Sequence, residues 1–297
     1  MTKTTTDATL TYVNGEPTLR FERRLRHAPA KVWRAVTDPA ELKHWFPAAV
    51  EAELRPGAPM RFTFPDTAPV DGQWDGEVLE VDEPKVFMFR WNSDVLRIEL
   101  VPDGDGCLLV FSQTLGGGRV GLLGAGRAAA GWDTCLDQLV ARLDGTTVPH
   151  RTDWVTPMAH YIEQFGLGEG TVVSTPEGDE LRFARDLVWR APADTWPVLV
   201  DSLEVDATKQ EPPRVLEHGW SHDGEPAGTV RWEFVSDPRL GERVELTHVL
   251  PAARADLRAL ALATWHHRLE LFFAAATGGV HDPWSEDRVA ELVEHYG

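Results

Sequence analysis

The hydrophobic pattern that organises this chain lies between Gly121 and Leu143. Its large apolar side chains are Trp132, Leu136, Leu139, Val140 and Leu143. They recur at the i, i+4, i+7, i+8 and i+11 positions of one face, which predicts a long amphipathic helix with a stop at Gly145. The first turns carry only small residues, including Ala129. Such a helix is expected to seal a core at one end, and at the other to approach a neighbour closely or leave space for a guest.

Short strands are expected before this helix. Apolar alternation from Ala8 to Leu25 around Asn14-Gly15 predicts a β-hairpin, because this dipeptide favours a tight two-residue turn. A short helix is expected from Pro29 to Asp38, and another helical turn from Pro39 to Phe46. Later strands are predicted at Met60–Phe64, Gln73–Val81, Val86–Trp91, Leu96–Val101 and Cys107–Leu115.

Several segments of the first half return in the same order in the second half. The matching pairs are Leu19–Trp33 with Leu181–Trp196, Arg97–Leu115 with Arg231–Leu250, Trp132–Gly145 with Trp265–Gly278, and Ile162–Gly166 with Val293–Gly297. Matches in one order indicate a tandem duplication. We therefore expect a first domain at residues 1–150, a linker with a short helix at 151–169, and a second domain at 170–297.

The second copy is shorter than the first at one place. The displacement between equivalent residues falls from 163 at Asp201 to 129 at Trp220, so 34 residues are missing between these two points. The missing part corresponds to the second short helix and the strands at Met60–Phe64 and Gln73–Val81. We therefore expect the second sheet to lack two strands.

Three segments carry a family resemblance. Ala28–Phe46 (APAKVWRAVTDPAELKHWF), Gly76–Trp91 and Gly131–Leu139 resemble the START/Bet v 1-like (SRPBCC) superfamily, in the branch named for the activator of Hsp90 ATPase. The resemblance implies an α+β fold of tandem helix-grip domains, each a curved antiparallel sheet around a long C-terminal helix. It also implies binding of apolar small molecules. Fused pairs of such domains resemble the di-domain proteins of polyketide and enediyne pathways.

Both copies place polar residues on faces that are otherwise apolar. Arg23 and Arg185 lie on the inward face of the first long strand, and Gln113 and His248 lie near the end of a late strand. A buried arginine must pair with a carboxylate or meet a polar guest, and the sequence leaves both alternatives open. Relatives commonly carry histidine at the late position, so Gln113 lacks its acid–base capacity.

Strand parity and the helix face predict a ligand cavity with aromatic walls in each copy, lined by a few polar groups. The predicted ligand-binding residues are Arg23, Phe89, Trp91, Phe111, Gln113, Ala129, Trp132, Arg185, His218, Trp220, Trp232, His248 and Trp265.

Charge, hydropathy and the absence of known motifs argue against several classes of function. The 297 residues carry a formal net charge of -18, which argues against a nucleic-acid partner. No apolar leader or long apolar run occurs, so we expect a cytoplasmic protein without membrane insertion. Because HExxH, paired CxxC and GxSxG motifs are absent, no metal, cofactor or nucleophilic serine is predicted.

Three functions remain open from the sequence. The leading hypothesis is a protein that binds a hydrophobic small molecule, such as a polyketide or polyene intermediate, as a carrier or processing protein. The second is a cofactor-free cyclase or aromatase, which needs an acid–base group in the cavity. The candidates are His218, His248 and the arginines Arg23 and Arg185. The third is a chaperone-associated or regulatory interaction module, which needs an exposed apolar patch.

Overall fold

The structure is a computed structural model that describes residues 7–66, 73–149, 151–203, 205–237, 240–279 and 283–297. The chain divides into two compact units, residues 1–161 and 162–297. The dividing point lies within helix α5 (Val155–Gln164). None of the helices in these ranges is long and apolar enough to cross a membrane.

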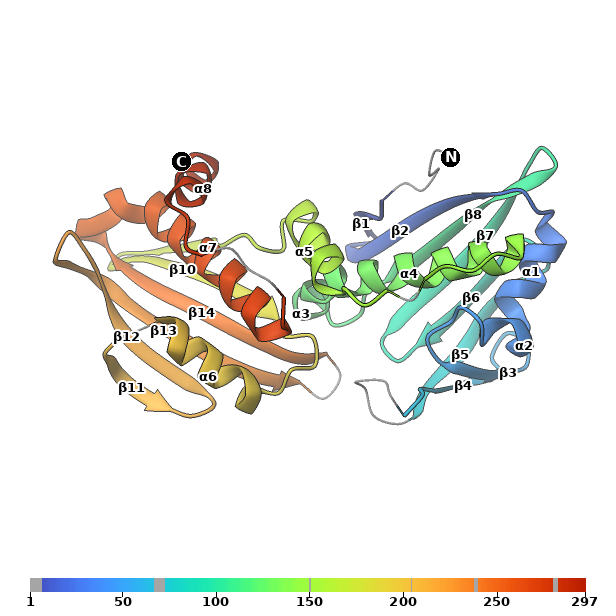
Figure 1. The fold of residues 1–297 in the computed structure, drawn as a ribbon, viewed down its shortest axis with the longest axis horizontal. Coiled ribbons are helices and arrows are strands. Elements are labelled where there is room, and N and C mark those ends of the chain that lie inside the picture. Colours follow the sequence, from blue (N-terminus) through green and yellow to red (C-terminus); the bar gives the residue numbers. More distant parts are fainter. Residues whose placement is uncertain (1–6, 67–72, 150, 204, 238–239, 280–282) are drawn as a thin grey trace. The chain divides into compact units, whose positions relative to one another are not determined.

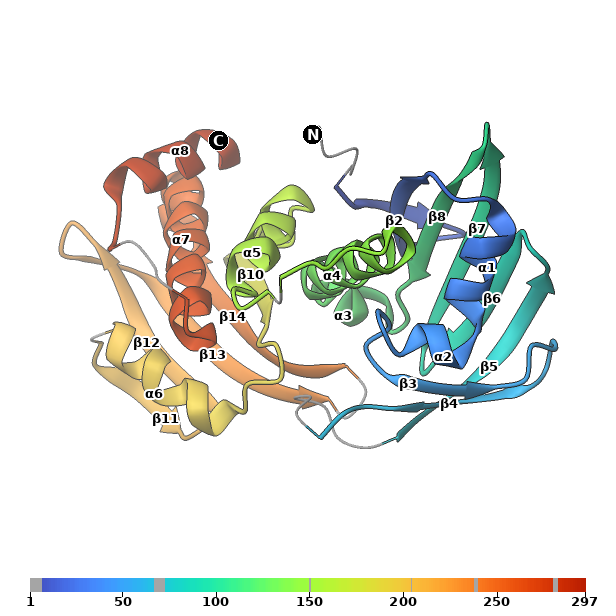
Figure 2. The same ribbon diagram turned by 45° about the vertical axis from the view of Figure 1, so that its right-hand side comes forward.

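The first domain is an eight-stranded antiparallel sheet with a long helix, α4, across one face (Figures 1 and 2). Its strands are β1 (Thr9–Val13), β2 (Glu16–Leu25), β3 (Ala49–Ala52), β4 (Pro59–Thr63), β5 (Gln73–Asp82), β6 (Val86–Trp91), β7 (Asp94–Asp103) and β8 (Gly106–Thr114). They lie in the order β1-β2-β8-β7-β6-β5-β4-β3. Its helices are α1 (Pro29–Thr37), α2 (Pro39–Leu42), α3 (Gly118–Leu123) and α4 (Ala125–Asp144).

Local sequence explains the first hairpin. Val13 pairs with Glu16, so only Asn14 and Gly15 form the turn, and both have left-handed φ angles of 53° and 84°. These residues tolerate that conformation at low cost, and the turn matches the natural twist of the two strands. The predicted hairpin is confirmed.

The long helix differs from the prediction at its start. The chain forms two helices, α3 and α4, which meet at Gly124, instead of one helix from Gly121. The predicted stop is confirmed, because Gly145 takes φ 67° and its N–H bonds to the carbonyl groups of the last turn. Trp132, Leu136, Leu139 and Leu143 are buried, and Ala129 is fully buried in the second turn of α4.

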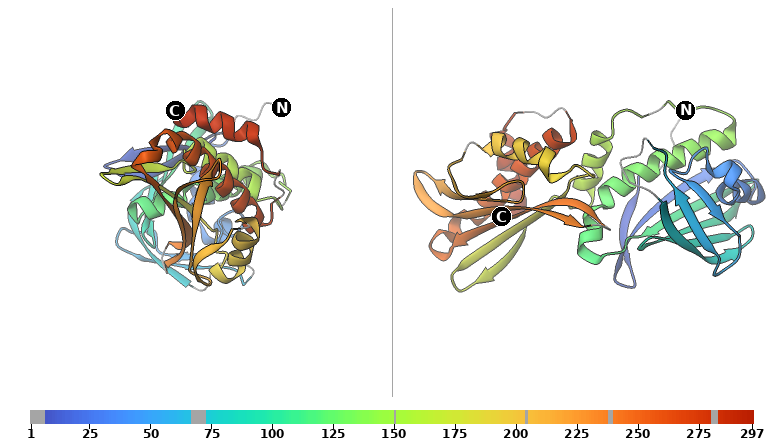
Figure 3. Two further views of the ribbon diagram at one scale, coloured as in Figure 1. Left: turned by 90° about the vertical axis from the view of Figure 1, so that its left-hand side faces the viewer. Right: turned by 90° about the horizontal axis from the view of Figure 1, so that it is seen from below.

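The second domain repeats this arrangement with six strands, and helix α7 lies across its sheet (Figure 3). Its strands are β9 (Thr171–Thr175), β10 (Gly178–Asp186), β11 (Ala207–Glu211), β12 (Val215–His222), β13 (Glu225–Asp237) and β14 (Gly241–Pro251). Its helices are α6 (Pro192–Leu203), the 3-10 helix η1 (Ala252–Leu257), α7 (Arg258–Thr277) and α8 (Glu286–Tyr296). The sheet order is β11-β12-β13-β14-β10-β9.

The two sheets match strand for strand from one edge. The order β1-β2-β8-β7-β6-β5 corresponds to β9-β10-β14-β13-β12-β11, and the first sheet then continues through β4 and β3. The expected fold class is confirmed: two tandem α+β helix-grip domains, with strands missing from the second. The identity of the missing strands needs correction. A short strand, β11, stands at the position of β5, and the strands without a counterpart among the described residues are β4 and the unpredicted β3.

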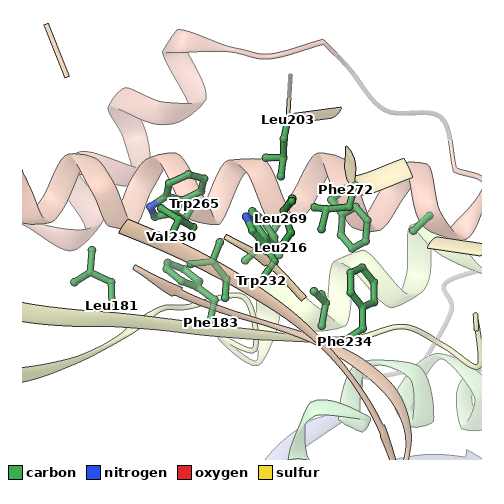
Figure 4. Packing of buried hydrophobic residues seen from close by; sticks show 14 of the residues in the cluster. Leu181, Phe183, Leu203, Leu216, Val230, Trp232, Phe234, Trp265, Leu269 and Phe272 are labelled. Carbon is green, nitrogen blue, oxygen red and sulfur yellow. The ribbon is translucent and has the colours of Figure 1, made fainter. Parts of the chain in front are cut away.

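The core of the second domain is packed between its sheet and α7, as Figure 4 shows for the cluster around Trp232. Trp232 is fully buried there. Phe234 contributes from the same strand, and Leu216 and Leu246 contribute from the neighbouring strands β12 and β14. Trp265, Leu269 and Phe272 of α7 close the cluster from the helix side. The large apolar side chains of the predicted helix face therefore lie where the sequence places them.

Candidate functional site

Trp132 of α4 is fixed by a chain of hydrogen bonds inside the first domain. Its indole Nε1–H donates to Oε1 of Gln113 over 2.7 Å, and Nε2 of Gln113 donates to Oδ2 of Asp94 over 2.6 Å. Asp94 Oδ1 accepts the backbone N–H of Gly116 over 2.9 Å. Burial raises the pKa of Asp94, and these donors oppose that rise. Both ends of the Gln113 amide are thus engaged by protein groups.

The second domain has the equivalent arrangement with a histidine. Trp265 Nε1–H donates to Nδ1 of His248 over 3.0 Å, and Nε2 of His248 lies 3.1 Å from the carbonyl oxygen of Ala227. An indole nitrogen only donates, so Nδ1 accepts and Nε2 carries the proton that it donates to Ala227. Burial lowers the pKa of His248 to about 4. His248 is therefore neutral at pH 7 and holds Trp265 as Gln113 holds Trp132.

His218 is engaged in the same manner. Trp232 Nε1–H donates to Nε2 of His218 over 3.2 Å, so Nδ1 carries the proton and donates to the carbonyl oxygen of Gly219 over 2.8 Å. Burial lowers the pKa of His218 as well. Both histidines among the predicted acid–base candidates thus use both ring nitrogens within the fold.

Arg23 pairs with an internal carboxylate. Its Nη2 lies 2.6 Å from Oδ1 of Asp133, which follows Trp132 on α4. The hydroxyl of Tyr161 donates to the other Asp133 oxygen and accepts the backbone N–H of Ala8 over 3.2 Å. Of the two alternatives for this buried arginine, pairing within the fold is the contact that the structure shows. A contact between Arg23 and a guest stays a prediction.

Arg185, the repeat equivalent of Arg23, is bonded to backbone oxygens. Nη1 donates to Leu167 over 3.0 Å and Nη2 donates to Gly168 over 2.9 Å. Burial lowers its pKa to about 10, so it stays charged at pH 7. Arg185 thereby holds the loop before β9 against β10.

In both domains a tyrosine hydroxyl accepts a hydrogen bond from the backbone just before the first strand. Tyr296 of α8 accepts the N–H of Gly170, just before β9, over 3.0 Å, and contacts Nδ1 of His266 over 2.8 Å. Tyr161 accepts the N–H of Ala8, just before β1. The duplicated fold therefore keeps this contact with tyrosines at non-equivalent positions of the repeat.

Six aromatic rings of the first domain cluster around Trp91, and we call them the aromatic box: Phe46, Phe62, Phe64, Trp74, Trp91 and Trp132. The centroid of Trp91 lies 4.9 Å from Phe62, 5.2 Å from Phe46, 5.8 Å from Phe64, 5.9 Å from Trp74 and 6.0 Å from Trp132. Phe46, Phe62 and Trp132 are buried, whereas Phe64, Trp74 and Trp91 are partly exposed. The box thus has a buried floor and a partly exposed rim.

Sequence reasoning missed four members of the box: Phe46, Phe62, Phe64 and Trp74. All four lie between Asp38 and Trp91, in the interval where the second copy is 34 residues shorter. That deficit, together with its aromatic content, is the signal that could have found them. In the second domain Trp220, the equivalent of Trp91, instead packs against His248 and Trp265 at 5.0 and 6.2 Å.

The other predicted residues divide into groups. In the first domain Phe89 lies 6.0 Å from Phe62, and Phe111 lies 4.5 Å from Trp132, so both border the box. In the second domain the structure brings together His218, Trp220, Trp232, His248 and Trp265. Arg185 lies apart from that group, at the loop before β9.

Gly76 of β5 makes the box possible, because Phe62 lies over its backbone. A Cβ added at Gly76 would overlap the carbonyl oxygen of Arg90 and come within 2.7 Å of the Phe62 ring. We expect Gly76→Ala to lower the free energy of unfolding by about 1–3 kcal/mol, as overpacking does. Gly131→Ala is the control, since nothing lies within 4 Å of its added Cβ and a helix favours alanine. Urea unfolding that ranks the two variants equally would contradict this packing.

One protein-family model matches a part of the first domain. Residues 26–144 match the family model described as activator of Hsp90 ATPase homolog 1-like protein. The resemblance predicted from the sequence is confirmed over these residues, which include α1, the box and α4. No curated protein matches the chain.

Solved structures of similar proteins cover one or both domains. EF2215 from Enterococcus faecalis, a conserved protein of unknown function, is 24% identical, with 54% of this chain and 90% of that chain covered and a TM-score of 0.46. CalU16 from Micromonospora echinospora is 21% identical, with coverages of 55% and 97% and a TM-score of 0.42. DynU16, a protein of the dynemicin biosynthetic locus, is 18% identical, with coverages of 88% and 96% and a TM-score of 0.41.

Proposed function

We propose that the first domain binds a flat, mainly apolar small molecule against the aromatic box. One observation carries this proposal: Phe64, Trp74 and Trp91 are partly exposed above a floor of buried rings. Clustered aromatic surface at the edge of a core is typical of ligand sites, because burying it releases water from apolar area. Flat rings at centroid distances near 5–6 Å also suit a flat conjugated guest that stacks on them.

A polyketide or polyene intermediate fits this surface best among biosynthetic small molecules. Such molecules combine extended flat hydrocarbon segments with occasional oxygen atoms. The resemblance to helix-grip proteins supports the same class of guest. The contacts of the second-domain residues and of Arg23, Gln113 and Ala129 with a guest stay predictions.

The engaged polar groups favour a carrier over a cyclase or aromatase. His218 and His248 are neutral at pH 7 and each uses both ring nitrogens within the fold. Gln113 has no acid–base capacity, and Arg23 is paired with Asp133. General acid–base catalysis needs a group that can reach the guest and change its protonation state. The sequence-predicted candidates do not supply one.

The proposal is tested with N-phenyl-1-naphthylamine, a probe whose fluorescence rises in apolar surroundings. We expect the full chain to bind the probe, and Trp74→Ser to weaken binding at least tenfold because it removes one wall of the rim. Trp154→Ser is the matched control, since Trp154 is 40% exposed and is not one of the six rings of the box. The proposal would be overturned if wild-type protein did not raise the fluorescence of the probe, or if the two variants weakened probe binding equally.

A further inference from the structure

The indole nitrogen of Trp91 is buried but has no hydrogen-bond partner among the described residues. Trp45, Trp132, Trp232 and Trp265 each donate to a protein acceptor, at 2.9, 2.7, 3.2 and 3.0 Å. A buried donor without an acceptor is uncommon in folded proteins, and it asks for an explanation.

The surroundings of Trp91 explain why the fold supplies no acceptor. Its neighbours in the box are three phenyl rings and two indoles, and an indole N–H is itself a donor. Gln113 is the side-chain acceptor bound to Trp132, and its other end is committed to Asp94. Trp91 as a residue is nevertheless partly exposed, although its Nε1 atom is buried.

We propose that Trp91 is a specificity-determining residue that selects guests bearing an oxygen acceptor on a flat conjugated frame, such as an aromatic ketone. This inference rests on the proposed function, because it assigns the polar contact of the same site. In this proposal the neighbouring rings of the box shift to admit the carbonyl oxygen of such a guest, which then accepts the Trp91 Nε1–H while the guest's rings stack on the rim. A hydrocarbon of the same shape makes the stacking contacts but leaves the donor unsatisfied. Sites built to hydrogen-bond a guest discriminate strongly against analogues that lack the polar group.

The pair 9-fluorenone and fluorene tests this inference, since the two tricyclic molecules differ only by a carbonyl in place of a methylene. Each is measured by competition against N-phenyl-1-naphthylamine on the full chain. The variant Trp91→Phe keeps an aromatic ring and removes the donor. We expect it to weaken fluorenone about tenfold and fluorene less than twofold. Trp74→Phe is the matched control, because it changes another rim indole and should affect both molecules equally.

The outcomes separate this inference from the proposed function. If the probe does not bind the wild-type chain, the proposed function fails and this inference fails with it. If the probe binds but neither molecule displaces it, this inference alone fails. If both compete and Trp91→Phe weakens them equally, the box binds guests but Trp91 does not select them. A wild-type measurement covers the case in which the variant does not fold: the indole N–H proton resonance of Trp91 should move downfield with fluorenone and not with fluorene. An unmoved resonance in saturating fluorenone would overturn the inference.

Discussion

We expect Asp133→Ala to lower the free energy of unfolding by about 3–5 kcal/mol relative to the wild-type chain. Asp133 is the carboxylate paired with Arg23, whose side chain is only 4% exposed. Removing Asp133 leaves the Arg23 guanidinium buried without an opposite charge, so the free-energy cost of desolvating that guanidinium is no longer offset. The hydroxyl of Tyr161 also loses this acceptor. Urea unfolding of the two proteins at pH 7.5 measures the difference.

A second substitution tests the cause. Arg23→Met in the Asp133→Ala background removes the buried charge, so we expect at least 2 kcal/mol of the lost stability to return. Arg24→Met is the control for a general effect of arginine removal, because its side chain is 64% exposed. A cost below about 1 kcal/mol for Asp133→Ala, or no recovery in the double variant, would show that the pair does not hold the fold.

His248→Gln is expected to be tolerated at pH 7.5 and to make the protein less sensitive to acid. Gln113 shows that a glutamine accepts the helix tryptophan at the same position of the repeat. Folding lowers the pKa of His248 from 6.5 to about 4, so the unfolded chain binds more protons between these values. The contribution of His248 to the free energy of unfolding is therefore fully present above pH 6.5, and it is lost as the pH falls from 6.5 through about 4.

The expected loss from this histidine alone is about 3 kcal/mol between pH 6.5 and 4. His248→Gln should remove that part of the acid sensitivity, and the contributions of His218 and His266 should remain. His248→Leu is the contrasting variant, because it leaves the Trp265 N–H without its acceptor and should cost about 1–3 kcal/mol at pH 7.5. Identical pH profiles for wild type and His248→Gln would contradict the assignment of a buried neutral imidazole.

The repeated parts of the fold could be predicted from the sequence because two copies constrain each other. Trp132 and Trp265 mark the same turn of the long helix, and the glycine stops follow both at equal distance. The edge strand β3 was missed because its sequence, AVEA, has weak strand propensity and is held by pairing with β4. The break between α3 and α4 at Gly124 was missed because the apolar spacing begins only at Trp132, and the small residues before it do not mark where a helix starts.

The polar partners could not be predicted because they depend on which side chains meet in space. Asp133 and Tyr161 lie outside the apolar pattern, and nothing in their spacing connects them with Arg23. The roles of Gln113 and His248 as acceptors for tryptophan likewise follow only from the distance to the helix. The box residues Phe64 and Trp74 had no second copy to draw attention to them.

The number and location of bound molecules test most directly whether the aromatic box of the first domain is the binding site. Equilibrium dialysis of the full chain against N-phenyl-1-naphthylamine should give one molecule per chain at saturation. Trp91 and Trp220 are equivalent in the repeat, but only Trp91 belongs to the box. We therefore predict that Trp91→Leu abolishes saturable binding and that Trp220→Leu keeps it, with near-UV circular dichroism confirming that both variants are folded. Two molecules per chain, or loss of binding in Trp220→Leu alone, would contradict a guest site built from the segment that the second domain lacks.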